Sequence, residues 1–377
     1  MAAEQMTTSK PNLPENRPLI FIIPTLLGGG AERVLIGLAN HFTQQFKIIL
    51  VALKSGTPAY PIDDRVTVIN LLERKKETLP YRVYDICLTF YKLLYILLKY
   101  RPACALSFIT SANIWTGITC SISNTPYIVS ERTSPKRKLN RSNFFVNSLT
   151  GLIYKKSRAV VVGTNAVEDC LRENSSFKSL KNIKKITNAV PAFEPVSGTK
   201  VHNRKFILGV GRLAHVKGFD QLISAFAEAE PDDTDLVIVG DGPEKASLLT
   251  LVHNLGLSGR VIFTGAKTDL QDYYNQAAIF VLPSRNEGYP NALVEAMSFG
   301  CPCIAMNCEF GPSEIITNGQ NGLLVDSGNI KALASEIKHL IEDASLANTL
   351  GTNAKKISDT NSAEKILNQW SRLILNN

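Results

Sequence analysis

The chain alternates short apolar runs with amphipathic stretches, and the whole alternation occurs twice. Apolar runs bounded by turn residues predict strands, and the stretches with a helical period between them predict helices. The first series comprises predicted strands at 19–24, 47–53, 66–71, 103–108, 127–130 and 159–163, with helices at 31–44 and 83–100. The second comprises predicted strands at 206–210, 236–239, 261–263, 279–282 and 302–305. Two such series predict an α/β chain with two doubly wound parallel sheets.

A segment rich in Pro, Ser and Gly at 191–198 separates the two series and predicts a hinge. We therefore expect an N-terminal Rossmann-like domain at 18–195 and a C-terminal one at 196–360. An amphipathic helix is predicted within the final segment, 361–377, while residues 1–17 are polar, Pro-rich and predicted to be disordered. At 377 residues and 45% hydrophobic, the chain can bury two cores of ordinary size.

Two carboxylates, Glu287 and Glu295, stand eight positions apart across a predicted loop-to-helix junction. Pro290 breaks the chain before the junction, and Asn291 is suited to cap a helix over 292–299. The N–H groups of the first helical turn favour an anion. The pattern suits a nucleotide sugar, with the diphosphate on the helix end, a sugar hydroxyl on Glu287 and the ribose diol on Glu295. An acidic loop followed by a salt-bridged surface helix is the alternative.

A second group of candidate residues follows the predicted strand 206–210. The strand runs into Gly211, which permits a tight turn, and Arg212 and Lys217 come next, before an apolar-periodic helix. A departing diphosphate develops negative charge, and a guanidinium with an ammonium can stabilise that charge without a metal. Either cation taken alone is commonly just a solvated charge at a helix entrance.

These motifs together resemble a known enzyme family. The Gly211-Arg-Leu…Lys-Gly segment, the Glu-x7-Glu spacing and Gly28-Gly-Gly-Ala-Glu-Arg33 resemble the retaining glycosyltransferases of family 4, over roughly residues 18–370. The resemblance implies the GT-B fold, two Rossmann-like domains facing a cleft, with the donor held mainly by the C-terminal one. It also implies that the C-terminal helix crosses back onto the first domain, and that no obligatory metal or other cofactor is needed.

The candidate site residues follow from the motifs and from the resemblance. The candidate catalytic residues are Glu287, Arg212 and Lys217. The candidate donor- or nucleotide-binding positions also include Gly29, Gly30, Gly211, Gly242, Ala266, Lys267, Gly288, Tyr289, Pro290, Asn291, Ala292, Leu293 and Glu295. On the acceptor side, the candidates are Asn113, Glu131 and Arg132. The Asp-x-Asp of Asp233 and Asp235 precedes a strand, at the edge opposite the ligand-binding ends, and is interpreted as an ordinary loop.

The charge of the chain is uneven. Residues 1–200 hold 27 Lys and Arg against 13 Asp and Glu, whereas residues 201–377 hold 14 against 20. The basic clusters lie at 74–76, 136–141, 155–158 and 178–185. In a GT-B enzyme the first domain binds the acceptor, so its charge suggests an anionic acceptor or an anionic membrane surface. Nucleic acid is the competing partner for a basic patch, but we find no motif for it and expect no nucleic-acid binding.

The most hydrophobic stretch, 86–98, is too short to span a bilayer. Its helical stripe is interpreted as a core face, with a lipid-facing surface as the alternative. The stripe consists of Val83, Ile86, Cys87, Phe90, Leu94, Leu97 and Leu98. No secretory signal opens the sequence, and the seven cysteines lack paired spacing, so we expect a cytoplasmic protein bound peripherally to the inner face of the membrane.

The Ser-Glu-Arg-Thr segment that begins at Ser130 resembles the family members that build bacterial surface glycans and lipid-linked oligosaccharides. We therefore expect transfer of a hexose or N-acetylhexosamine, with UDP preferred as the donor nucleotide, to a polyprenyl-pyrophosphate-linked saccharide. Three alternatives remain open: a mannosyltransferase using GDP-mannose, a UDP-N-acetylglucosamine epimerase or hydrolase, and a nucleotide-sugar binding protein without turnover.

Overall fold

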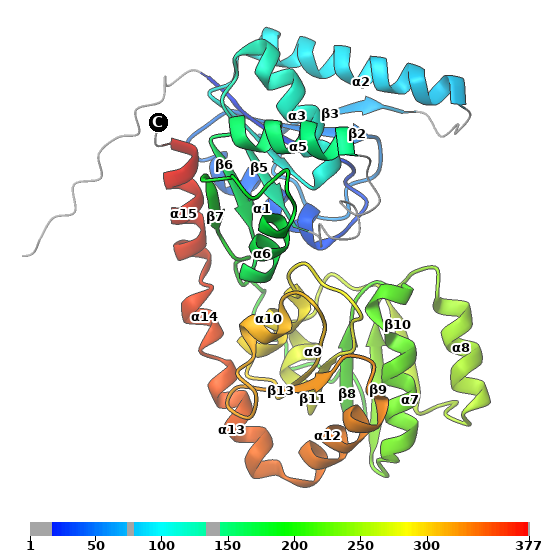
Figure 1. Ribbon diagram of the computed structural model, residues 1–377. Coiled ribbons are helices and arrows are strands. Elements are labelled where there is room, and N and C mark those ends of the chain that lie inside the picture. The colour runs from blue at the N-terminus through cyan, green and yellow to red at the C-terminus, as the bar shows by residue number, and fades with distance from the viewer. Residues whose placement is uncertain (1–16, 74–78, 133–143, 376–377) are drawn as a thin grey trace, which may run out of the picture. The chain divides into compact units, whose positions relative to one another are not determined.

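The computed structural model describes residues 17–73, 79–132 and 144–375 (Figure 1). The basic clusters predicted at 74–76 and 136–141, and the predicted disordered N-terminus up to residue 16, lie outside the described residues. The chain divides into two compact units. The first holds the residues up to Val162, Glu168–Ile186 and the chain from Leu367, and the second holds Gly163–Val167 and Thr187–Ile366.

The first unit is built on a parallel sheet with the strand order β3-β2-β1-β4-β5-β6-β7. Its strands are β1 (Leu19–Ile23), β2 (Ile48–Lys54), β3 (Thr67–Leu72), β4 (Cys104–Phe108), β5 (Tyr127–Glu131), β6 (Ala159–Val162) and β7 (Ile183–Lys185). The helices are α1 (Gly30–Phe42), α2 (Leu79–Tyr100), α3 (Thr110–Ser123), α5 (Phe144–Lys156) and α6 (Asn165–Glu173). The central strands β1, β4 and β5 are buried at every position, as expected of parallel strands covered by helices on both faces.

Helix α2 departs from the sequence prediction. Its core-facing side chains are Leu93, Ile96 and Leu97, which are buried. Of the stripe predicted to be a core face, Ile86 is 54% exposed and Leu98 is 55% exposed, so this interpretation is wrong for most of the stripe. The physical reason is that α2 carries apolar residues around most of its circumference, and only one side packs against the rest of the unit.

The chain from Leu367 packs within the first unit. Helix α15 (Ala363–Leu375) buries Trp370 completely, with its ring 5.7 Å from that of Phe108. The guanidinium of Arg132 lies 5.0 Å from the Phe108 ring and 5.5 Å from the Trp370 ring. The Nη1 atom of Arg158 donates to the carbonyl of Ile374 at 2.9 Å. Stacking thus fixes Trp370 at the carboxyl ends of β4 and β5, and the Arg158 hydrogen bond holds the end of the helix beside the amino end of β6.

The second unit is built on a parallel sheet with the strand order β10-β9-β8-β11-β12-β13. Its strands are β8 (Lys205–Val210), β9 (Thr234–Val239), β10 (Val261–Gly265), β11 (Ile279–Leu282), β12 (Cys303–Asn307) and β13 (Leu323–Asp326). The helices are α7 (Phe219–Ala229), α8 (Lys245–Asn254), α9 (Gln271–Gln276), α10 (Asn291–Ser298), α11 (Pro312–Ile315), α12 (Ile330–Glu342), α13 (Ala344–Ala354) and α14 (Ile357–Thr360). A 3₁₀ turn spans His215–Lys217.

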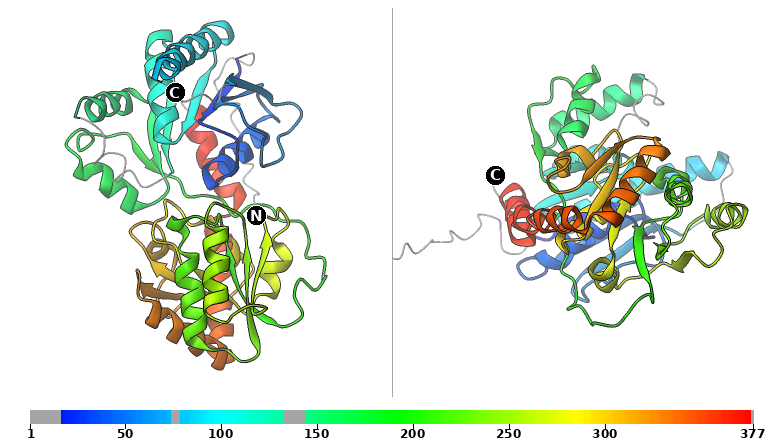
Figure 2. Two further views of the ribbon diagram at one scale, coloured as in Figure 1. Left: turned by 90° about the vertical axis from the view of Figure 1, so that its right-hand side faces the viewer. Right: turned by 90° about the horizontal axis from the view of Figure 1, so that it is seen from below.

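Helices cover both faces of the second sheet (Figure 2), and an apolar core lies on each face. Side chains alternate along β8, so Ile207 packs in one core with α7 and α12, while Phe206 and Leu208 pack in the other with α9 and α10. The predicted α/β architecture with two parallel sheets is confirmed.

Within the residues that the structure describes, no helix has both the length and the apolar character needed to cross a membrane.

Candidate active site

The order of strands in the second sheet defines where a ligand can bind. Strands β8 and β11 are neighbours, and the chain proceeds from β8 toward one edge of the sheet and from β11 toward the other. In such sheets the crevice outside the carboxyl ends of the two central strands is the usual ligand site. The loop at 211–218 follows β8 and the loop at 283–290 follows β11, so the predicted cationic and carboxylate motifs both reach this point.

Lys217 and Glu287 form an ion pair at this switch point. The Nζ atom of Lys217 lies 2.7 Å from Oε1 of Glu287, and Ser284 Oγ donates to the same oxygen at 2.7 Å. The Glu287 side chain is 6% exposed, so the ammonium and the hydroxyl offset the cost of burying its charge. Among the described residues, none donates a hydrogen bond to the other oxygen, Oε2. Both residues were predicted as site residues, but the sequence did not indicate their pairing.

A second ion pair, which the sequence did not indicate, holds the loop after β11. Nη1 and Nη2 of Arg285 bind the carboxylate oxygens of Asp220 on α7 at 2.7 and 2.6 Å. Burial by itself would raise the pKa of Asp220, but the Arg285 hydrogen bonds outweigh it and the pKa is lowered. Arg285 also bridges to the loop after β8, because its backbone N–H donates to Val216 and its Nη1 to His215. Arg285 therefore holds the loop after β11 to the loop after β8.

Gly218 sits where these loops approach most closely. Its φ is +67°, in the left-handed region, and a Cβ atom at this position would collide with the carbonyl oxygen of Pro283. Gln221 Nε2 donates to the same carbonyl at 3.0 Å. Only glycine lets α7 begin this close to the end of β11, which brings Lys217 within reach of Glu287.

The remaining predicted donor-binding positions of the loops also follow strand ends. Gly211 and Gly242 lie after β8 and β9, and Ala266 and Lys267 follow β10 as exposed residues. Arg212 is exposed and forms no ion pair with any residue that the structure describes. Its guanidinium is available to an anionic ligand at the carboxyl edge of the sheet.

The start of α10 differs from the sequence prediction. Pro290, not Asn291, occupies the N-cap position, and no side chain caps the helix. Asn291 is instead the first residue of the helix, and its Oδ1 accepts a hydrogen bond from Asn188 Nδ2 at 2.6 Å. Two of the three amides predicted to hold the diphosphate already have backbone partners: Asn291 donates to Tyr289 and Leu293 to Pro290. A diphosphate bound here would have to share these two donors with the turn.

Glu295 and Tyr289 are both buried. Glu295 is 3% exposed, and its Oε2 accepts a hydrogen bond from Tyr274 on α9 at 3.0 Å. Tyr289 is 8% exposed, and its hydroxyl accepts from Asn361 Nδ2. As placed, these two side chains fix α10 and the Gly288–Pro290 turn to the body of the unit. A role for Glu295 with the ribose remains a prediction.

In the first unit, the candidate glycines lie at the corresponding place. Gly29 and Gly30 follow β1, next to β4, at the switch point of the first sheet. Gly30 begins α1, and Gly29 is its N-cap with an extended backbone. The backbone at these positions therefore lies at the carboxyl edge of that sheet, and its contact with a donor stays a prediction.

The three candidate acceptor-side residues are buried, and their role on the acceptor side stays a prediction. Asn113 is 0% exposed and Glu131 is 1% exposed. Asn113 Nδ2 donates to Glu131 Oε1 at 3.2 Å and to Tyr154 at 3.1 Å, while Tyr154 also donates to Glu131. Burial, and next the Glu131 carboxylate, raises the pKa of Tyr154 well above its usual value. Arg132 is 7% exposed and stacks on the rings already described. These residues join the ends of β4 and β5 to α3 and α5.

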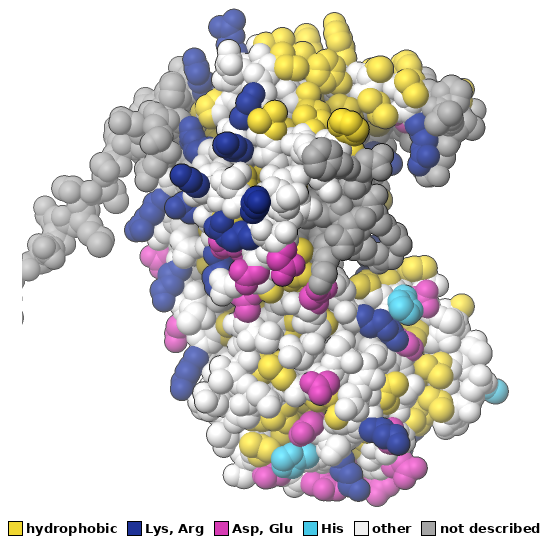
Figure 3. Space-filling view, in the orientation of Figure 1, with side chains coloured by type: hydrophobic (Ala, Val, Ile, Leu, Met, Phe, Trp, Pro, Cys, Tyr) yellow, Lys and Arg dark blue, Asp and Glu magenta, His cyan; other side chains and the backbone are white. Residues whose placement is uncertain are grey.

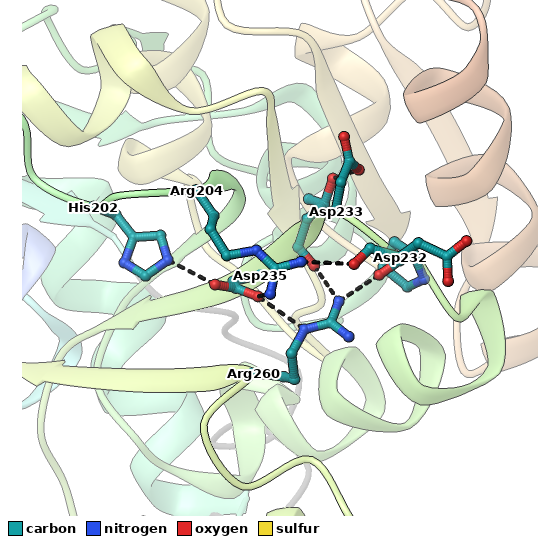
Figure 4. Close-up of polar contacts among 8 residues, drawn as sticks. His202, Arg204, Asp232, Asp233, Asp235 and Arg260 are labelled. Atoms are coloured by element: carbon teal, nitrogen blue, oxygen red, sulfur yellow. Dashed lines mark hydrogen bonds and ion pairs between the residues drawn. The ribbon is translucent and has the colours of Figure 1, made fainter.

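The Asp-x-Asp motif belongs to a structural ion cluster at the opposite edge of the second sheet (Figure 4). Asp235 in β9 accepts hydrogen bonds from His202 and Arg260 at 2.8 Å each, and Arg204 lies 3.5 Å away. Burial opposes ionisation, but the His202 and Arg260 hydrogen bonds dominate, so the pKa of Asp235 is lowered. The cluster ties β9 to neighbouring segments. The motif was interpreted as an ordinary loop, whereas Asp235 lies within β9 and is buried.

Comparison with known proteins places this geometry in a family. Residues 192–357 match the family described as glycosyl transferases group 1. An uncharacterized glycosyltransferase of Haemophilus influenzae is 28% identical over 359 residues, covering 94% of this chain and 98% of that protein. A Campylobacter jejuni α-1,4-N-acetyl-D-galactosaminyltransferase, named for a diNAcBac-PP-undecaprenol-linked acceptor, is 27% identical, covering 94% and 97%. The structure of Anabaena HepE in complex with UDP matches with a TM-score of 0.78 at 19% identity, covering 94% of this chain and 98% of that one.

The match to HepE, with its low identity, shows the fold, which is GT-B, and confirms the predicted fold. The sequence match lies over the unit that carries Lys217 and Glu287, and the Haemophilus and Campylobacter relatives match over nearly the whole chain. Residues 192–357 of this chain belong to the group 1 glycosyltransferases, and the prediction of a retaining glycosyltransferase of family 4 that uses a nucleotide sugar is confirmed.

Proposed function

We propose that this enzyme transfers a hexose or N-acetylhexosamine from a UDP-linked donor to a polyprenyl-pyrophosphate-linked saccharide at the inner face of the cell membrane. The observation that carries the donor site is the Lys217–Glu287 pair at the β8–β11 switch point, with the exposed Arg212 on the same loop. The Campylobacter relative, by its name, acts on an undecaprenol-PP-linked glycan, and the matched HepE structure contains UDP; both support the choice of acceptor and nucleotide.

In this proposal Glu287 orients the donor sugar. Its Oε1 is occupied by Lys217 and Ser284, so Oε2 is the oxygen available to accept a hydrogen bond from a sugar hydroxyl. The fixed loop keeps the carboxylate in place before the donor arrives, because Arg285 and Asp220 lock it to α7. Such preorganisation lowers the cost of orienting the sugar for reaction.

Lys217 and Arg212 stabilise the departing diphosphate. As the bond from the anomeric carbon to the phosphate oxygen breaks, that oxygen gains negative charge, which the two cations offset. The acceptor hydroxyl forms the new bond on the same face of the sugar, and the leaving phosphate accepts its proton. Configuration is then retained without a protein nucleophile, and we assign none.

A donor panel tests the proposal. Purified enzyme is given UDP- and GDP-sugars in turn, and nucleotide release is followed with and without a polyprenyl-pyrophosphate-linked saccharide. We expect release with one UDP-sugar that requires the acceptor and collapses in Glu287→Ala. Lys245→Ala, which removes an exposed lysine from the same unit, is the matched control and should leave release unchanged.

The other outcomes contradict specific parts of the proposal. Release without any acceptor identifies an epimerase or hydrolase. Release that requires GDP-mannose identifies a mannosyltransferase. Tight UDP binding without release from any donor in the presence of the lipid-linked acceptor contradicts that choice of acceptor.

A further inference from the structure

Helix α2 presents an apolar side to solvent that the glycosyl-transfer chemistry does not use. The exposed fractions are 54% for Ile86, 70% for Tyr91, 56% for Tyr95 and 55% for Leu98, and Ile122 on the adjacent α3 is 57% exposed. We call these five residues the α2–α3 face. Figure 3 shows hydrophobic side chains gathered over the α2 end of the first unit, with Lys and Arg side chains beside them. A contiguous exposed apolar patch of this kind indicates an interaction surface.

A shallow hollow of about 490 Å³, open to solvent, lies between α2 and α3 and shares Ile86 and Tyr91 with this face. It is lined by Ile86, Cys87, Phe90, Tyr91, Trp115 and Ile118, so that its surface is almost wholly apolar. Hollows that bind small molecules normally add several polar groups to fix the ligand's orientation. The lining therefore suits a flexible hydrocarbon chain better than a sugar or a nucleotide.

The charged residues of α2 flank the apolar side rather than interrupt it. At 100° per residue, Lys92 and Lys99 fall on the arc next to Tyr95. The Lys99 ammonium lies 5.8 Å from the Tyr95 ring, whereas the Lys92 ammonium donates to the carbonyl of Leu71 at 2.7 Å. Helices α2, α3 and α5 together hold five Lys or Arg and a single acidic residue, Asp85. Aromatic residues at an apolar boundary with lysines beside them are typical of helices that lie in a membrane interface.

We infer that the α2–α3 face inserts into the headgroup–acyl boundary of an anionic bilayer, with a lipid chain entering the α2–α3 hollow. The charge favours this occupant over a second copy of the chain, because two copies meeting at this face would bring like charges together. Anionic headgroups instead attract each nearby lysine. The inference rests on the proposed lipid-linked acceptor, since a membrane-bound enzyme meets that acceptor in the plane of the bilayer.

The test measures vesicle binding without donor or acceptor, so it does not depend on turnover. The full chain is sedimented with vesicles of phosphatidylglycerol and phosphatidylcholine, or of phosphatidylcholine alone. We expect binding to the anionic vesicles that weakens as salt rises. Ile86→Glu and Tyr91→Glu should each weaken it by about tenfold or more, because each places a charge in the hydrocarbon boundary. Both residues are exposed, so neither variant disturbs the core.

Leu249→Glu is the matched control. Leu249 is 48% exposed on α8 of the second unit, and the same substitution there should leave vesicle binding unchanged. Tryptophan fluorescence adds a local readout, because the chain has two tryptophans and Trp370 is fully buried. Brominated lipids should quench the emission of wild type, and the quenching should be lost in Trp115→Phe.

The contradicting results are distinct. Absence of binding to anionic vesicles, or equal binding by wild type, Ile86→Glu and Leu249→Glu, overturns the inference. A dimer in light scattering that Ile86→Glu dissociates, without vesicle binding, assigns the face to a second copy instead. Transfer to a detergent-solubilised acceptor should persist in Ile86→Glu. If the wild-type enzyme binds vesicles but transfers no sugar to the acceptor, the proposed function is refuted and the assignment of this surface still stands.

Discussion

The substitution Lys217→Ala removes the ammonium that faces Glu287 across the switch point of the second sheet. The Glu287 carboxylate, 6% exposed, then keeps only the hydroxyl of Ser284 as a donor. Two effects follow from this one change. The folded state holds a buried charge without its counter-charge, and the departing diphosphate loses one of its two cations.

The magnitudes can be estimated from the burial of the pair. Removing one partner of a fully buried ion pair costs about 3–5 kcal/mol. The Lys217 side chain is 29% exposed, so water partly replaces it, and we expect a loss of about 1–3 kcal/mol in the free energy of unfolding. Loss of one group that stabilises developing charge typically costs about 10²–10³-fold in kcat, and we expect a decrease of this size.

Two assays on the same protein separate these effects. Urea unfolding gives the stability loss, and single-turnover nucleotide release gives the rate of the chemical step with saturating donor. Lys245→Ala is the control, because its pair with Asp241 is solvent-exposed and longer, 3.4 Å, and both variants lose the same charge. It should change stability by less than about 1 kcal/mol and leave the rate unaltered.

The reasoning is refuted if Lys217→Ala keeps a folded second unit and a single-turnover rate within about threefold of wild type. The ammonium would then contribute nothing to the departure of the diphosphate. A rate loss equal to that of Lys245→Ala would refute it in the same way, since the position of the lysine would not matter.

Three further outcomes follow from the packing. Gly218→Ala should destabilise the second unit by about 2–3 kcal/mol in urea unfolding, against about 1 kcal/mol for Gly256→Ala. Both glycines have φ +67°, but only a Cβ at position 218 would meet a carbonyl, that of Pro283. Equal losses in the two variants would contradict this close approach. Asp235→Asn should cost about 2–3 kcal/mol at neutral pH without changing donor affinity. Because the pKa of Asp235 is lowered from its usual 3.8, the stability that its charge contributes is complete only well above pH 3.8 and is lost as the pH falls through the lowered value. Wild type and variant should therefore converge in unfolding experiments at low pH, and a constant difference would contradict this expectation. Trp370→Ala should cost about 3–5 kcal/mol in the unfolding of the first unit, and a small effect would show that the end of the chain does not depend on this ring.

The sheet architecture was predictable because parallel strands buried on both faces form continuous apolar runs. Strands β1 and β11 illustrate this, since every residue in each is buried. Strands β7 and β13, which are short and lie at the sheet edges, were not predicted. The three residues of β7, Ile-Lys-Lys, carry no apolar run at all.

For helix α2, the periodicity of apolar residues does not tell which side of the helix is buried. A stripe at helical spacing indicates that one side of a helix is apolar, but α2 has apolar residues on two sides. The side with Leu93 faces the core and the side with Tyr91 faces solvent. Only the packed structure distinguishes them, because the contacts made by α3 decide which side is covered.

The site was predictable in its parts but not in its connections. Lys217 and Glu287 were identified from their motifs, and the strand order explains why positions 70 residues apart meet. The Arg285–Asp220 pair has no sequence signature, since neither residue stands in a recognisable pattern. Asn is a residue type that often caps helices, yet the Asn291 side chain accepts a hydrogen bond from the side chain of Asn188, 103 residues away in the sequence.

The most direct test of the account is a crystal structure of the enzyme with an unhydrolysed UDP-sugar. The account predicts the diphosphate at the carboxyl ends of β8 and β11, within hydrogen-bonding distance of Lys217 and Arg212. It also predicts a sugar hydroxyl on Oε2 of Glu287. A nucleotide sugar bound elsewhere, or one bound at this edge while Lys217 and Glu287 contact only each other, would contradict the assignment of the donor site.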